Sequence, residues 1–167
     1  MSLLLKLFNY KKWADERAIR AAHEIDIKRF PKEEKFIRQQ LNHLVLVEEN
    51  FKARLLCEIE PNQTNNTEVI PPLNAIASRI NISNAWYEDY VVKIRDDDLN
   101  KEVSFVFVDK LLGRMTRYEI LFHIINHSTY HRGAIGRELD IAGALRPADT
   151  YTAFIHIAEP QRRNHSN

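Results

Sequence analysis

The chain has 167 residues, 44% of them hydrophobic and 28% charged, with a formal net charge of +1. This composition is typical of a globular protein, and the near-neutral charge offers no general attraction to polyanions, so we expect no nucleic-acid partner. No segment approaches the ~20 apolar residues needed to cross a bilayer, so we expect no membrane partner either.

The length fits one domain, which we place at residues 1–160, followed by a polar tail at 161–167. Cys57 is the single cysteine, so no internal disulfide can form. This agrees with a reducing compartment, and because no signal peptide is visible we expect a cytoplasmic protein.

The first half of the chain has the periodicity of two helices. Apolar residues recur at three- and four-residue steps through residues 2–26. Proline and acidic residues at 31–34 suit the first turn of a second helix, which extends to about Ile59. The second helix is expected to bury one stripe of side chains: Phe36, Leu44, Val47, Phe51 and Leu55.

Two further long helices are predicted after the polar, turn-rich connection at residues 60–70. The third follows Pro71 and Pro72 and ends near Ile94. The fourth spans about Thr116 to Ala142, where the spacing of Thr116 and Glu119 indicates a capping box.

The predicted fold class is therefore all-α, a four-helix bundle with long crossover connections. The β-branched and aromatic residues at 103–108 favour a short strand or hairpin between helices three and four. A short C-terminal helix is expected at about residues 147–158.

Three histidines are the candidate site. His127 and His131 are four residues apart on the fourth helix, so their side chains project nearly along one line, and His43 lies in an apolar stretch of the second helix. Periodicity predicts that all three face inward. Buried imidazoles need strong partners, and a divalent metal would provide one. The spacing leaves open whether they bind a metal or are ordinary core histidines.

The sequence offers other candidate site residues at or near these helices. His123 extends the row, but eight residues separate it from His131 by ~12 Å, so these two cannot share one ion; a pairing of His123 with His127 stays open. Cys57 lies ~21 Å beyond His43 on one helix and is interpreted as core. Glu48 and Glu49 point elsewhere around the helix and are left out of the site.

Tyr130 and Arg132 flank His131 in the sequence. They could orient a substrate anion or close a helix contact, and ordinary surface packing is the preferred interpretation.

The segment His123–Gly133 resembles the hallmark of the DinB/YfiT-like superfamily, the damage-inducible DinB family of metal-binding four-helix bundles. Residues 8–17 and 41–44 resemble its first and second helices. The resemblance implies that His43, His127 and His131 are metal ligands and that the protein forms a homodimer. The sequence departs from the family at Ala134–Ile135, where Gln often follows the Arg-Gly step, and this weakens any inference about polar groups around the ligands.

Three imidazoles leave a divalent ion an open position, and Zn or Ni, with Fe or Co as alternatives, suits such a site. The resemblance implies a metalloenzyme that activates a small thiol or water for transfer or hydrolysis of a small-molecule substrate, and no protein general base is identified in the sequence. A low-molecular-weight thiol as the small-molecule partner is likewise what the resemblance implies. The alternative is a non-catalytic metal-binding stress-response protein.

Overall fold

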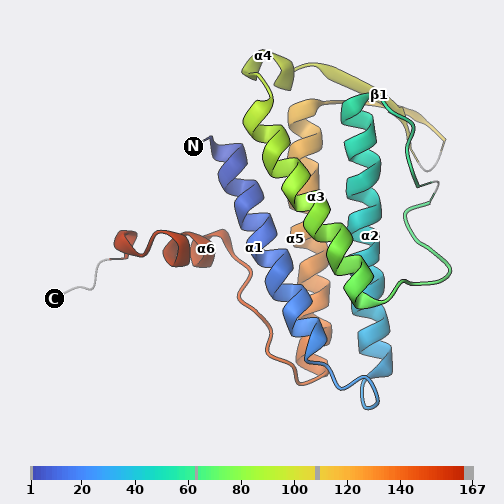
Figure 1. Ribbon diagram of the computed structural model, residues 1–167, viewed down its shortest axis with the longest axis vertical. Helices are drawn as coiled ribbons and strands as arrows, with labels where there is room; N and C mark the ends of the chain where they lie inside the picture. Colours follow the sequence, from blue (N-terminus) through green and yellow to red (C-terminus); the bar gives the residue numbers. More distant parts are fainter. Residues whose placement is uncertain (1, 63, 108–109, 164–167) are drawn as a thin grey trace.

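The computed structural model describes residues 2–62, 64–107 and 110–163, and four long helices lie side by side in it (Figure 1). They are α1 (Leu3–His23), α2 (Pro31–Leu56), α3 (Leu73–Lys93) and α5 (Arg117–Ile141). Both α1 and α2 pack against α3 and α5. The predicted four-helix bundle is confirmed. Among the described residues, no helix is long and apolar enough to span a membrane.

The connections set the direction of each helix. α2 and α3 run the same way, so the link between them returns along the length of the bundle as a crossover (Figure 1). Between α3 and α5 lie the one-turn helix α4 (Asp96–Leu99) and an antiparallel hairpin of β1 (Glu102–Val106) and β2 (Leu112–Thr116). The predicted strand at 103–108 overlaps β1, and residue 108 lies outside the described residues.

The helix ends follow local chemistry. The Thr116 hydroxyl accepts a hydrogen bond from the Glu119 N–H, and the Glu119 carboxylate accepts one from the Thr116 N–H at 2.7 Å, which is the predicted capping box. α2 begins at Pro31 as expected. It ends at Leu56 rather than Ile59 because Cys57 adopts the left-handed conformation that stops a helix.

The short C-terminal helix α6 (Tyr151–Ala158) begins later than the predicted residue 147 and lies outside the bundle, against α1 (Figure 1). It is followed by a 3-10 turn at Pro160–Arg162. The predicted tail at 161–167 therefore starts inside that turn, and residues 164–167 lie outside the described part of the chain.

Two predicted core positions were wrong. Phe36 is exposed, and its neighbour Ile37 is buried instead. Seven residues bring a helical side chain nearly back to its starting direction, so Phe36 shares the edge on which His43 is only half-buried. Cys57 is exposed because it lies just past the end of α2, beyond the packed part of the helix.

The core consists of two apolar clusters separated by a polar layer. One cluster includes Phe8, Phe51 and Ile124, and the other includes Ile19, Leu41 and Ile135. On α1, α3 and α5, buried polar residues lie between the two clusters in the sequence, and on α2 Glu48 directly follows Val47, the first residue of that helix in the Phe8 cluster. This polar layer consists of Lys11, Asp15, Glu48, Ser83, Asn84, Ser128 and Arg132.

Candidate metal centre

The three predicted histidines come together between α2 and α5. His127 Nε2 lies 3.1 Å from His43 Nε2 and 3.0 Å from His131 Nε2. Among the described residues these three form a group whose ligand atoms all lie within 4.8 Å of one another. Imidazole nitrogens bind Zn at about 2.0–2.1 Å, so nitrogens with this spacing could hold one ion.

Two oxygen atoms fix the orientation of the outer histidines. His43 Nδ1 lies 2.7 Å from the backbone oxygen of Asn65, and His131 Nδ1 lies 2.6 Å from Gln40 Oε1. An oxygen acceptor requires a proton on each Nδ1, so the lone pair of each ring is on Nε2 and points at His127. Partners of this kind commonly hold metal-binding histidines in place.

This arrangement of lone pairs fits a cation. His127 Nε2 faces two nitrogens that both present lone pairs, and a single proton on it could satisfy only one of them. A metal ion would accept all three lone pairs. The His127 Nδ1 is buried and has no hydrogen-bond partner among the described residues, so the polar contacts of this ring are made through Nε2.

The surroundings keep these imidazoles neutral. Burial lowers the pKa of His127 to about 3, and the neighbouring His131 and His43 add to the shift. Burial and His43 lower the pKa of His131 to about 4. Neutral imidazole is the form that binds a metal, so both rings are ready to act as ligands at neutral pH.

His123 lies beside this group but outside it. Its ring stacks on that of His127 with centroids 5.2 Å apart, and on the other side it contacts Phe51 at 5.0 Å. The predicted exclusion of His123 from the His127–His131 pair agrees with this placement. Its side chain lines a cavity instead.

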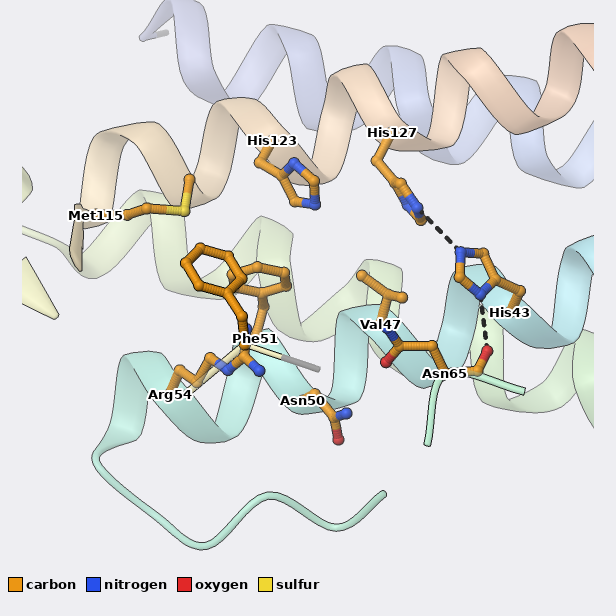
Figure 2. A pocket seen from close by; sticks show the side chains of 10 residues that line it. His43, Val47, Asn50, Phe51, Arg54, Asn65, Met115, His123 and His127 are labelled. Atoms are coloured by element: carbon orange, nitrogen blue, oxygen red, sulfur yellow. Dashed lines mark hydrogen bonds between the residues drawn. The ribbon is translucent and has the colours of Figure 1, made fainter. Parts of the chain in front are cut away.

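That cavity, of about 260 Å³, opens directly onto His43 and His127 (Figure 2). Figure 2 shows the two rings at one end of the hollow, with His123, Phe51 and Met115 farther along it. His131 does not line the cavity. An ion between the three Nε2 atoms would therefore have a face toward this space.

The polar layer lies inside the bundle, next to the turns that carry the histidines. Lys11 Nζ contacts the carboxylates of Asp15 and Glu48 at 2.8 and 2.7 Å, and all three side chains are buried. Burial alone would raise the pKa of Asp15, but Lys11 and Arg132 hold it below its ordinary value. Burial raises the pKa of Glu48, and Lys11 opposes that shift.

Arg132 corrects a prediction. The sequence favours ordinary surface packing for this residue, but its side chain is buried, and its guanidinium donates to Asp15 at 2.8 Å and to Asp149 at 2.7 Å. A cation is buried when carboxylates compensate it, and these two come from distant parts of the chain. Tyr130, in contrast, is exposed as expected.

Sequence reasoning missed the residues that support the histidines. Gln40 precedes His43 by three residues, so helical spacing alone could have placed both on one face of α2. Asn65 contributes a backbone oxygen from the crossover connection, and no sequence signal marks such a contact. Glu48 is left out of the ligand group by the sequence, and its place in the polar layer is a further residue that sequence reasoning missed.

Fold and site together describe a helical bundle whose histidines could hold a divalent metal ion. The sequence profile of the DinB family matches residues 1–164, nearly the whole chain. The protein belongs to the DinB family. No curated protein and no solved structure matches it.

Proposed function

We propose that this protein binds a divalent metal ion through His43, His127 and His131 and is an enzyme that activates a small thiol or a water molecule for transfer or hydrolysis. The observation that carries the proposal is the convergence of three Nε2 atoms at the end of a cavity of about 260 Å³. Zn or Ni is the proposed ion, with Fe or Co as alternatives.

The ligand set supports a catalytic site rather than a closed structural one. Structural zinc sites are completed by a fourth protein ligand, whereas catalytic sites keep a position for water or substrate. Among the described residues the group contains three ligands and no fourth. Such an ion would lower the pKa of a coordinated water or thiol and so give a nucleophile at neutral pH.

The protein's own residues would hold and shape this site. The Asn65 carbonyl and Gln40 keep His43 and His131 in the tautomer whose Nε2 is available. Val47 and Phe51 make the nearby cavity wall apolar, which favours the exclusion of bulk water around a reacting group. The low-molecular-weight thiol as co-substrate is supported by the family resemblance alone.

The first experiment measures metal content. Purified protein and the variants His43→Ala, His127→Ala and His131→Ala would be analysed by elemental mass spectrometry after equilibration with Zn²⁺. His23→Ala is the matched control because His23 is exposed at the end of α1. We expect one ion per chain in the parent and control, and a large loss in each ligand variant.

The second experiment tests catalysis. The metal-loaded protein would be screened with small thiols and electrophilic acceptors, and with activated esters. We expect turnover that a chelator abolishes and added metal restores. Full metal occupancy in all three ligand variants would contradict the metal site, and bound metal without any chelator-sensitive turnover would favour a non-catalytic metal-binding role.

A further inference from the structure

The cavity beside the histidines has a largely apolar wall away from them. Val47 and Phe51 contribute to it from α2, and Phe107 and Met115 contribute from the hairpin region. Aromatic rings and a thioether pack well against the face or edge of another ring. In Figure 2, Phe51 and Met115 lie on the part of the hollow that is farther from His43.

Arg54 is the one formally charged side chain among the described residues of this wall, and its charge is already compensated. Arg54 donates from Nε and Nη2 to the two carboxylate oxygens of Glu60, each at 2.8 Å. Its guanidinium also lies over the Phe51 ring, 4.6 Å from the centroid. An anion would have to compete with Glu60, and a cation would meet no carboxylate among the described residues that line the cavity. An uncharged group enters at the lowest desolvation cost.

Gly113 sets the position of one aromatic wall. A Cβ at Gly113 would lie 1.9 Å from the ring of Phe107, so only glycine lets this ring lie against β2. The Phe107 ring also makes an edge contact with Phe105, with centroids 4.9 Å apart. A methyl group at position 113 would therefore meet the Phe107 ring first and displace it.

The cavity continues into a polar groove. A second space, of about 590 Å³, shares Asn50, Arg54, Asn65 and Phe107 with the first. Its other walls include Glu58, Asn62, Thr64 and Lys110. The side chains that line this groove carry carboxylate, amide, hydroxyl and ammonium groups, so the groove suits the hydrogen-bonding part of a molecule.

We propose that the cavity beside the histidines is a chamber for an uncharged aromatic group of the substrate, whose polar remainder lies in the outer groove. This inference rests on the proposed function, because it names the class of substrate for the same site. It assigns Phe51, Phe107 and Met115 to substrate binding and Gly113 to the placement of Phe107.

The test uses the methyl resonance of Met115 as a local reporter. The chain contains two methionines, Met1 and Met115, so ¹³C-methyl labelling gives a simple NMR spectrum. Benzyl alcohol, benzylamine and benzylsulfonate would each be titrated into the metal-free and the Zn-loaded protein. We expect saturable shifts of the Met115 methyl with benzyl alcohol, and binding at least tenfold weaker for the charged probes.

Variants then locate the binding. Gly113→Ala should weaken benzyl alcohol binding at least fivefold, while Gly133→Ala is the matched control because its Cβ would meet nothing within 4 Å. Should Gly113→Ala fail to fold, Phe107→Ala replaces it, because Phe107 is partly exposed. This truncation enlarges the chamber and should shift the preference from benzyl alcohol toward 1-naphthalenemethanol.

The outcomes separate this inference from the proposed function. An unshifted Met115 methyl, or equal binding of charged and uncharged probes, overturns the chamber even when Zn²⁺ binds normally. Benzyl alcohol binding that needs Gly113 supports the chamber even in a protein that takes up no metal, in which case the proposed function alone fails.

Discussion

Ser128 on α5 donates a hydrogen bond of 3.3 Å to Glu48 on α2. Ser128 directly follows His127 in the chain, and Glu48 lies about one and a half turns beyond His43. The two helices that supply the histidines are thus linked inside the core beside the candidate metal centre. Lys11 binds the same Glu48 oxygen at 2.7 Å, so the link also includes α1.

Replacement of Lys11 tests the polar layer. Lys11→Met removes the cation between two buried carboxylates, and an uncompensated buried charge costs about 3–5 kcal/mol of unfolding free energy. Urea unfolding measures this loss. Lys12→Met is the matched control, because Lys12 pairs with Glu88 at 3.0 Å on the partly exposed side of α1, and a loss of about 0–1 kcal/mol is expected there.

The double variant Lys11→Met/Glu48→Gln refines this test. Glu48→Gln removes one of the two buried carboxylates that lose their cation in Lys11→Met. The double variant should therefore lose less stability than the sum of the two single changes. Strict additivity, or a Lys11→Met variant no less stable than the Lys12→Met control, would contradict the role given to the polar layer.

Gln40 should control metal affinity without binding the metal. Gln40→Ala removes the acceptor that holds the His131 Nδ1 proton at 2.6 Å. Loss of such a partner typically weakens metal binding about 10–100-fold. Competition with a chromophoric chelator measures the Zn²⁺ dissociation constant, and Gln39→Ala, one position earlier on α2, serves as the control. An unchanged constant for Gln40→Ala would show that His131 needs no such support.

Acid should destabilise the metal-free protein in a defined range. The pKa values of His127 and His131 are about 3 and about 4 in the fold, against an ordinary value of 6.5. Between these limits the unfolded chain binds protons that the native protein does not, so the unfolding free energy falls as the pH drops from about 6.5 toward 4. Urea unfolding at a series of pH values measures the slope.

His127→Asn provides the control for this pH dependence, because an amide does not titrate. The variant should show a shallower slope over the same range than the parent protein. Equal slopes would mean that His127 is not held neutral by its surroundings.

The sequence predicted the bundle and the ligand group for different reasons. The capping box at Thr116 and the four-residue spacing of His127 and His131 are local features that the helix alone determines. The approach of His43 to them depends on how α2 packs on α5, so spacing left it open and the family resemblance supplied it. Arg132 could not be placed from its neighbours, because its carboxylate partners come from α1 and from the segment before α6.

Asp149 should hold the C-terminal segment on the bundle. Its carboxylate accepts hydrogen bonds from Arg132 Nε and from the Tyr10 hydroxyl, both at 2.7 Å, just before α6 begins. Asp149→Ala leaves Arg132 with Asp15 as its carboxylate partner and should cost about 1–3 kcal/mol. Because α6 has few other contacts with the bundle, hydrogen exchange in residues 151–158 should accelerate more than in α2. Asp140→Ala is the control, since its pair with Arg146 is exposed. Unchanged exchange in α6 would show that its aromatic contacts with Tyr10 and Trp13 suffice to hold it.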